Sequence, residues 1–325
     1  MGASGRPKWL RRILRLLGPL VLVLLLYRLG DPQAILDLLR EAETRWLVLA
    51  IAANVGAVAF KVMRWQALLR ARGVDYPFGR ATAAFLSSLY VGMLTPGRVG
   101  DVLRIQYLRH DRGLTYAEGL ASVVIDRLCD IYVLLAMVAL GVTRLSRVLV
   151  GDLAVVTWGG VVAVGLLPLV LFVPGATEKT FGRIYARVAR DPSGLDRFLV
   201  GLRSYVGRAL FVAVPLTLLA FLVSVGQGWL IARALRLELG FLDVLGLLAM
   251  GNLLGLLPIS VSGVGVREAF YAAMFPALGL TAATGVTYGL LVFAVIFLSL
   301  TVFGFISWQL APPPAAPVAE EPAND

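Results

Sequence analysis

The stretch that decides the fold is Leu94-Thr95-Pro96-Gly97-Arg98-Val99-Gly100-Asp101-Val102-Leu103-Arg104. It contains a helix-breaking Pro-Gly pair and three charged side chains, and an apolar run precedes it directly. A second stretch of the same kind follows later: Pro258-Ile259-Ser260-Val261-Ser262-Gly263-Val264-Gly265-Val266-Arg267-Glu268. In a membrane protein, irregular charged backbone at membrane depth is tolerated only inside the protein or beside a water-filled cavity. The two stretches are therefore candidate site segments.

The composition indicates a membrane protein. The chain has 325 residues, of which 59% are hydrophobic and only 15% are charged, and its mean hydropathy is +0.83. A soluble domain has roughly 45–50% apolar and about 25% charged residues. Several apolar runs approach the ~20 residues that a membrane-spanning helix needs, and the alternating strands of an outer-membrane barrel are not visible. The sequence predicts an all-α polytopic membrane protein.

The net charge of +10 is concentrated between the apolar runs. This distribution suits orientation by the positive-inside rule and contact with anionic lipid headgroups. Binding of nucleic acid is not expected, because no soluble domain is predicted that could present the basic residues. Cys129 is the single cysteine, so an intramolecular disulfide is excluded. The sequence predicts neither a cofactor nor a metal ion.

The apolar runs predict about six spanning helices. The first is read as a retained span, because no small-residue cleavage site follows it as in a signal peptide. A short amphipathic helix over 33–43 is expected at the interface, and the tail 312–325 is expected to be disordered. The six expected spans cover residues 16–27, 46–69, 117–141, 153–173, 209–232 and 280–310.

Two further apolar segments are too short to cross a membrane. Residues 81–94 would reach about 21 Å, whereas the hydrocarbon core is about 30 Å thick. After the Pro-Gly turn the chain returns over 99–108, which predicts a re-entrant helical hairpin. Residues 244–257 and 264–275 predict a second hairpin around Pro258.

The distribution of basic residues orients these elements. With the N-terminus and the basic loop 174–208 in the cytoplasm, the first hairpin enters from the cytoplasm and the second from outside, and both termini are cytoplasmic. The halves 46–141 and 209–310 then form an inverted repeat within one transmembrane domain, residues 1–311. Inverted repeats with broken helices that meet near the midplane are a transporter architecture.

The first turn offers groups that suit a phosphate. Gly97 and Gly100 let another backbone approach closely, and a helix that starts near Val99 would present its N–H groups and positive dipole end. Arg98 or Arg104 would add bidentate recognition of a phosphate. For Asp101 three roles stay open: it caps the helix, pairs with an arginine, or binds a substrate ammonium or a proton.

The second turn offers Ser262, Gly263 and Gly265, followed by Arg267 and Glu268. Because Arg267 and Glu268 are sequence neighbours on a helix, they point to different faces and need different partners. The Gly-x-Gly is not a dinucleotide fingerprint, since no βαβ unit surrounds it. Asn252, in the apolar run before the turn, is either a packing residue or a substrate contact.

A charged cluster lies inside the expected span 117–141. Asp126 and Asp130 are one helical turn apart, and Arg127 can reach Asp130 at the i, i+3 spacing. Charges at the bilayer centre cost at least ~2.5–3.5 kcal/mol each, so they usually pair and mark function. The formal surplus of one negative charge could be met by an arginine elsewhere; the candidates are Arg98, Arg104 and Arg267. A purely structural ion network is the alternative.

Lys61 and Arg64 end the span 46–69, three residues apart and on one helical face. Two readings stay open: the pair anchors the helix at the interface, or it forms a basic stripe that faces a lipid phosphate. Signatures of enzymes are not found, because the chain has one histidine, no nucleophile elbow and no P-loop. The sequence therefore does not predict an enzyme.

Three segments resemble one family. The segment Thr95–Arg104 resembles its "TPGxxGExxR" motif, Asp126–Asp130 its "ERLxD" motif, and Gly263–Glu268 its "GGxGxRE" motif. The family is the lysylphosphatidylglycerol synthase transmembrane region, the flippase-like UPF0104 group. Asp101 and Asp126 stand where the family usually has Glu, and Val-Ser-Gly replaces its Gly-Gly approach to the second turn.

The resemblance implies a lipid flippase in the cytoplasmic membrane. Bifunctional members carry a soluble synthase domain that aminoacylates phosphatidylglycerol; no such domain follows residue 311 here, so aminoacyl transfer is not expected. Stand-alone relatives are associated with polyprenyl or hopanoid lipids and with glycan assembly. Expected partners are anionic or phosphate-bearing lipids, with a second copy of the chain and a separate lipid-modifying enzyme as further candidates.

Two other functions stay open at this point. Inverted hairpins also occur in ion- or proton-coupled transporters of small polar solutes. An accessory protein or enzyme of lipid-linked glycan metabolism is the other alternative.

Overall fold

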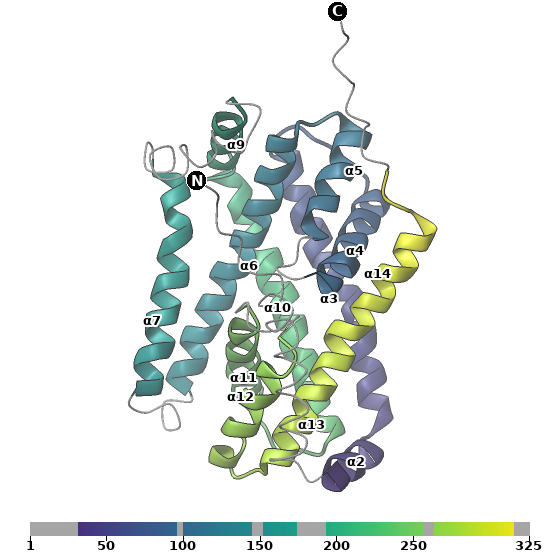
Figure 1. The fold of residues 1–325 in the computed structure, drawn as a ribbon, viewed down its shortest axis with the longest axis vertical. Helices are drawn as coiled ribbons and strands as arrows, with labels where there is room; N and C mark the ends of the chain where they lie inside the picture. The colour runs from purple at the N-terminus through teal and green to yellow at the C-terminus, as the bar shows by residue number, and fades with distance from the viewer. Residues whose placement is uncertain (1–31, 96–99, 145–151, 174–192, 257–262, 315–325) are drawn as a thin grey trace, which may run out of the picture.

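A computed structural model describes residues 32–95, 100–144, 152–173, 193–256 and 263–314, and every regular element in these ranges is a helix (Figure 1). The expected first span 16–27 and most of the tail, residues 315–325, lie outside the described residues. The same holds for five predicted turn or site residues, namely Pro96, Gly97, Arg98, Pro258 and Ser262.

Among the described residues, three helices are both long and apolar enough to cross a membrane. They are α3 (Thr44–Arg70), α10 (Arg208–Ala234) and the continuous helix Ala282–Leu310. At 1.5 Å per residue, the 27 residues of α3 reach about 40 Å. The predicted spans 46–69, 209–232 and 280–310 are therefore confirmed as helices.

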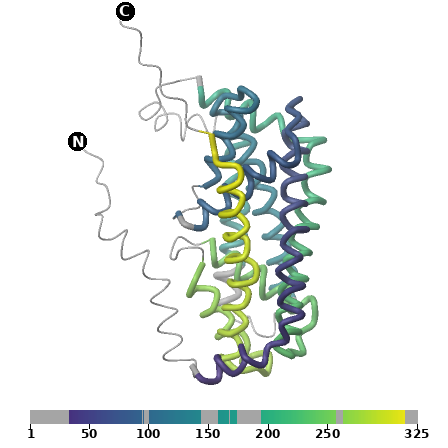
Figure 2. The backbone as a smooth tube through the Cα atoms, turned by 90° about the vertical axis from the view of Figure 1, so that its right-hand side faces the viewer, coloured from purple at the N-terminus to yellow at the C-terminus, as the bar shows by residue number. Residues whose placement is uncertain are grey.

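The last of these helices changes its winding in the middle. It consists of α13 (Ala282–Val292), the π-helical turn η4 (Phe293–Leu298) and α14 (Ser299–Leu310). Figure 2 shows α3 and α10 running side by side along the length of the molecule, in agreement with the close packing of these two helices. Together they form the long wall against which the shorter helices pack.

Two more helices correspond to expected spans. α6 (Tyr116–Arg144) is 29 residues long, but it contains too many charged residues to count as one of the clearly apolar spans. α7 (Asp152–Leu166) continues into the 3₁₀ turn η2 (Leu167–Phe172). In the described part of the chain, three spans instead of about six thus meet both criteria of length and composition.

The two predicted breaks each separate a pair of short helices. α4 (Phe78–Leu94) is followed by α5 (Val102–Arg112), and α11 (Phe241–Leu254) is followed by α12 (Val266–Met274). Within each pair the helices pack against each other. Figure 1 shows the α4–α5 pair in the upper half of the molecule and the α11–α12 pair in the lower half.

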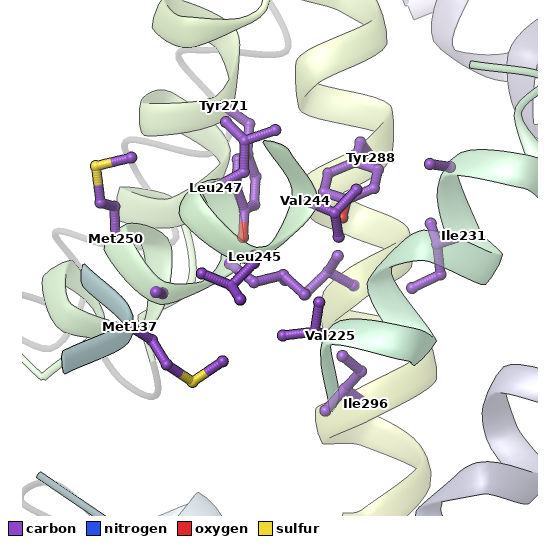
Figure 3. Packing of buried hydrophobic residues seen from close by; sticks show 14 of the residues in the cluster. Met137, Val225, Ile231, Val244, Leu245, Leu247, Met250, Tyr271, Tyr288 and Ile296 are labelled. Carbon is purple, nitrogen blue, oxygen red and sulfur yellow. The ribbon is translucent and has the colours of Figure 1, made fainter. Parts of the chain in front are cut away.

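The largest apolar core joins the second half of the chain to α6. It packs α11 against α6, α10 and α13, with Tyr271 and Tyr288 meeting edge to face at 5.2 Å between ring centroids (Figure 3). At the crossing of α6 and α11, a Cβ on Gly141 would lie 2.5 Å from the Cα of Gly246. This close approach fixes α6, which carries the candidate site, against the second half.

Two amphipathic helices pack at the ends of the molecule. In α2 (Pro32–Glu41), Ile35 is buried against Ala272 and Val286, whereas Leu36 and Leu39 are exposed. This confirms the amphipathic helix predicted over 33–43. α9 (Ser193–Arg203), within the basic loop predicted over 174–208, packs against α6.

A polar cluster ties the start of α4 to the end of α5, outside the apolar segments. Tyr76 donates its hydroxyl to Asp111 at 2.7 Å, and Arg80 donates to the same carboxylate at 2.8 Å. His110 Nδ1 lies 2.9 Å from Asp111 Oδ1. Burial acts to raise the pKa of Asp111, but the hydrogen bonds from His110, Tyr76 and Arg80 outweigh it and lower the pKa below its usual value.

This lowered pKa predicts how stability depends on pH. An aspartate has a pKa of about 3.9 in an unfolded chain, so the ionised Asp111 contributes its stabilisation above that pH and loses it as the pH falls through the lower folded value. We expect Asp111→Asn to lose about 1–3 kcal/mol at neutral pH, and the gap to wild type to close on acidification. Thermal unfolding in detergent from pH 7 to pH 3 measures this.

Asp75→Asn is the matched control for this change, because Asp75 is 84% exposed and its 3.3 Å contact with Arg70 is a surface ion pair. A gap between Asp111→Asn and wild type that stays constant with pH would contradict the assignment.

Candidate functional site

A cavity of about 400 Å³ lies between the two halves of the molecule. Its wall is formed by α3, α4, α6, α10, α11, η4 and α14, together with Asp101 at the start of α5. One part of the wall is charged, with Lys61, Asp101, Arg127 and Asp130. The polar members of the wall are Asn54, Ser88, Ser224 and Asn252, and the remaining lining side chains are mostly apolar, among them Leu89, Met93, Leu256, Phe297 and Leu300.

Six charged side chains form a closed network beside this cavity, which we call the charge ring. α3 contributes one arginine, α6 contributes two aspartates and an arginine, and the start of α5 contributes an aspartate and an arginine. Each arginine contacts two aspartates, and each aspartate contacts two arginines. In order around the ring they are Arg64, Asp126, Arg104, Asp101, Arg127 and Asp130.

One side of the charge ring is fully buried. Arg64 Nε donates to Asp126 Oδ1 at 2.7 Å, and Arg104 Nη1 donates to Asp126 Oδ2 at 2.8 Å; all three side chains are 0% exposed. Arg64 Nη1 also donates to Asp130 at 2.6 Å and to the hydroxyl of Thr217 at 3.1 Å. α3, α5, α6 and α10 are thereby joined at one point.

The other side of the charge ring faces the cavity. Arg127 holds Asp101 with two hydrogen bonds of 2.7 Å, and its Nη1 lies 3.3 Å from Asp130. Arg104 Nη2 completes this side with a 3.1 Å contact to Asp101. Arg127, Asp101 and Asp130 keep 28%, 18% and 15% of their side-chain surface exposed. Only this side of the ring can meet a molecule in the cavity.

The local sequence explains why the ring closes. Asp126 and Asp130 are one turn apart on α6 and therefore share one face, which is the face that Arg64 of α3 reaches. Asp101 and Arg104 are three residues apart across the first turn of α5. Three arginines and three aspartates leave the ring with no net charge, which a low-dielectric interior requires, because an uncompensated buried charge is strongly unfavourable.

The ring decides among the readings that the sequence left open. Asp101 occupies the N-cap position of α5 but makes no side-chain capping hydrogen bond, so the capping prediction is wrong and the ion-pair prediction is confirmed. The predicted contact of Arg127 with Asp130 is confirmed at 3.3 Å. The surplus of one negative charge in the Asp126–Arg127–Asp130 cluster is met by Arg104, one of the predicted candidates, which lies 2.8 Å from Asp126. Arg64 and Asp101 then complete a ring of three arginines and three aspartates.

Arg267 and Glu268 take separate roles, as their adjacent positions predicted. The guanidinium of Arg267 lies 3.9 Å from the ring centroid of Phe297, is only 2% exposed, and is not among the described lining residues of the cavity. Glu268 accepts a 2.6 Å hydrogen bond from the N–H of Gly265 and caps α12. Arg267 thus lies against Phe297, which lines the cavity, and its contact with a headgroup stays a prediction.

The glycines of both turns have the predicted structural role where they are described. A Cβ on Gly100 would lie 2.1 Å from the carbonyl oxygen of Ser88 and 2.2 Å from the nitrogen of Gly92, so α5 starts in direct contact with the backbone of α4. Gly263 and Gly265 have φ of 79° and 85°, which side chains disfavour. These glycines let each pair of short helices pack closely.

Lys61 and Arg64 separate, although they share a helical face. Arg64 belongs to the buried side of the charge ring, whereas Lys61 lines the cavity with its ammonium 5.9 Å from the ring centroid of Phe221. The buried position of Arg64 contradicts the anchor reading for that residue. Asn252 also lines the cavity, which is the position that its predicted substrate contact requires.

Sequence reasoning missed Asn54 as a site residue. Its side-chain amide donates to the carbonyl of Val295 at 2.8 Å and to Ser299 at 2.7 Å, and Gln227 donates to its carbonyl oxygen at 3.0 Å. These bonds act on the π-helical turn η4, and π turns often mark functional sites. An amide inside each of two long apolar helices is the signal that could have identified Asn54 and Gln227.

The fold and the cavity define a helical membrane protein that encloses a charged site between two sets of broken helices. The sequence matches the family described as lysylphosphatidylglycerol synthase TM region over residues 12–304. Because this match covers most of the chain, the protein belongs to that family, and a membrane location follows.

Three relatives are similar to this chain. A protein named glycosyltransferase AglD from Haloferax volcanii is 26% identical over 84% of this chain, which spans about half the length of that relative. A UPF0104 membrane protein of Methanothermobacter thermautotrophicus is 20% identical over 83% of this chain and 86% of its own length. The UPF0104 membrane protein PH1989 of Pyrococcus horikoshii is 20% identical over 86% of this chain and 90% of its own length.

Proposed function

We propose that this protein is a lipid translocase of the cytoplasmic membrane. A phosphate-bearing headgroup enters the cavity while the acyl or prenyl chains remain in the bilayer. The observation that carries the proposal is the division of the cavity wall. Lys61 and the exposed side of the charge ring form a charged part, and Leu89, Met93 and Leu300 on α4 and α14 belong to an apolar part. A molecule with a charged head and an apolar tail matches both parts.

The arrangement of the broken helices supports movement between two sides. The α4–α5 and α11–α12 pairs lie in opposite halves of the molecule along its long axis (Figure 1), and the cavity takes lining residues from α4, the start of α5, and α11. Two re-entrant hairpins that enter from opposite sides, related as an inverted repeat, would produce this arrangement. In this proposal both termini are cytoplasmic, and no bond of the lipid is made or broken.

The charge ring has a defined task in this proposal. Its buried side holds α3, α5 and α6 together, and its exposed side presents Asp101, Arg127 and Asp130 to the headgroup. Because every ring member already has two partners, the ring offers polar contacts without a net charge. The ring can therefore hydrogen-bond to the headgroup without binding it so tightly that it cannot leave the cavity.

A cavity-filling variant tests this function. Ser224 of α10 lines the cavity, so Ser224→Phe is expected to reduce the rate of headgroup translocation at least ten-fold in proteoliposomes. The assay follows the decrease in fluorescence as externally added dithionite reduces the label on phosphatidylglycerol that has reached the outer leaflet. Val214→Phe is the matched control, because it places the same side chain on the same helix at a position that is 45% exposed.

Two results would reject the proposal. One is wild-type protein that moves lipid no faster than empty vesicles. The other is Ser224→Phe protein that translocates at the wild-type rate while remaining folded.

The Haloferax relative favours a second candidate. Its name includes glycosyltransferase, so the cavity of this chain could serve a lipid-linked sugar phosphate in glycan assembly, with a separate enzyme as partner. The same proteoliposome assay with a labelled polyprenyl phosphate sugar distinguishes the two candidates. Faster movement of that lipid than of phosphatidylglycerol would favour the second.

A further inference from the structure

We infer that the cavity binds a headgroup with a single net negative charge, such as a phosphodiester lipid, through Lys61, and that it disfavours net-cationic aminoacylated headgroups. The inference rests on the proposed function and names its substrate class. It follows from the number of charges around the cavity and from where Lys61 lies.

The charge ring contributes nothing to the net charge of the cavity. It contains three arginines and three aspartates in mutual contact, so its formal charge is zero. Arg267 and Glu268, side by side at the start of α12, also cancel. Lys61 then leaves a formal charge of +1 at the cavity, whichever carboxylate it contacts.

Other charges do not reverse this sign. Among the described lining residues, the charged side chains are Lys61, Asp101, Arg127 and Asp130. The count of +1 is the count of the charged residues that the structure describes at and beside the cavity wall.

Arg127 is less suited than Lys61 to receive the anion. Both of its donors toward Asp101 make 2.7 Å hydrogen bonds, and an anion would have to break this bidentate pair to replace the carboxylate. Lys61 lies one turn before Arg64, with its ammonium 5.9 Å from the Phe221 ring centroid. The ammonium is a point charge on a flexible chain with three rotatable donors, so it can donate to a phosphate in addition to the partner that it already has.

The size of the charge determines the class of lipid. In a cavity of low dielectric, an uncompensated charge is unfavourable, so the most stable complex is the one whose total charge is zero. A phosphodiester carries one negative charge and brings the total to zero. A lysyl ester of phosphatidylglycerol carries one phosphate and two ammonium groups, a net charge of +1, and would raise the total to +2.

Binding of three lipids to the purified full-length protein tests the inference. The probes are phosphatidylglycerol with charge −1, phosphatidylcholine with charge 0 and lysylphosphatidylglycerol with charge +1, each titrated in a neutral detergent and followed by native mass spectrometry. Wild-type protein is expected to bind phosphatidylglycerol at least ten-fold more tightly than either other lipid. Lys61→Gln should lose this preference, whereas Lys61→Arg should keep it.

Two further variants make the test specific. Lys61→Glu should shift the preference toward lysylphosphatidylglycerol, which a purely structural role of Lys61 would not produce. Arg236→Gln is the control, because it removes a basic side chain that is 72% exposed and remote from the cavity wall. Thermal unfolding of each variant identifies any that fail to fold. If Lys61→Gln fails to fold, Lys61→Arg and Lys61→Glu still decide the test.

The outcomes separate this inference from the proposed function. Equal binding of the three lipids, or tighter binding of lysylphosphatidylglycerol by wild-type protein, would overturn the inference even if proteoliposomes translocate lipid. Lys61-dependent binding of phosphatidylglycerol without any translocation would support the inference and reject the translocase.

Discussion

Replacing Asp126 with asparagine is expected to destabilise the protein by about 3–5 kcal/mol, because breaking a buried ion pair leaves its partners with an uncompensated charge. Asp126 is 0% exposed and lies between Arg64 and Arg104, at 2.7 Å and 2.8 Å. Asparagine keeps the size of the side chain and removes the charge that both guanidinium groups share. Unfolding by heat or denaturant in detergent measures the loss.

A double variant shows whether the charge is the cause. Arg104→Gln combined with Asp126→Asn restores neutrality, so its loss should be smaller than the sum of the two single losses. Asp37→Asn is the control, since Asp37 is 63% exposed and its 3.6 Å contact with Arg40 is a surface pair, for which about 0–1 kcal/mol is expected. An Asp126→Asn protein within 1 kcal/mol of wild type would contradict the ring as a source of stability.

Gly100→Ala is expected to have the second large effect. The added Cβ would lie 2.1 Å from the Ser88 carbonyl oxygen and 2.2 Å from the Gly92 nitrogen. Both atoms are backbone and cannot rotate away, so α5 must move from α4. Overpacking costs about 1–3 kcal/mol and occasionally more, and here the displaced helix carries Asp101 and Arg104. We expect lower stability together with slower lipid translocation.

Gly56→Ala gives the matched comparison. Gly56 lies inside α3, and a Cβ there meets nothing within 4 Å. Because glycine in a helix interior is less favourable than alanine by about 0.5–1 kcal/mol, this variant should be as stable as wild type or more stable. If both alanine variants have the same thermal stability, the close contact of α5 with α4 does not contribute to the stability of the fold.

Much of the fold could be predicted from the sequence, because hydrophobic periodicity and helix breakers act locally. The broken pair 81–94 and 99–108 corresponds to Phe78–Leu94 and Val102–Arg112, and the amphipathic helix at 33–43 corresponds to Pro32–Glu41. The number of spans could not be read with the same certainty. α6 is 29 residues long but contains Asp126, Arg127 and Asp130, so length and hydropathy disagree there.

The site could be predicted only in part. The charged residues of α6 and of the first turn were identified, since charges inside apolar sequence are conspicuous. The contact of Arg127 with Asp130 was also predicted. The pairing of Asp126 with Arg64 was not, because it depends on how α3 crosses α6: the two residues are 62 positions apart in sequence. For the same reason, the sequence could not show that Arg267 lies against Phe297 of the cavity wall.

The charge ring also constrains how the chain enters the membrane during synthesis. Insertion of α6 alone would expose three charged residues, at about 2.5–3.5 kcal/mol for each that reaches the bilayer centre. All of its partners in the ring, namely Arg64, Asp101 and Arg104, precede α6 in the sequence. Because synthesis proceeds from the N-terminus, the neutralising residues have already been synthesised when α6 leaves the ribosome. The order of the segments in the sequence thus favours insertion of α6, because this charged helix follows the residues that neutralise it.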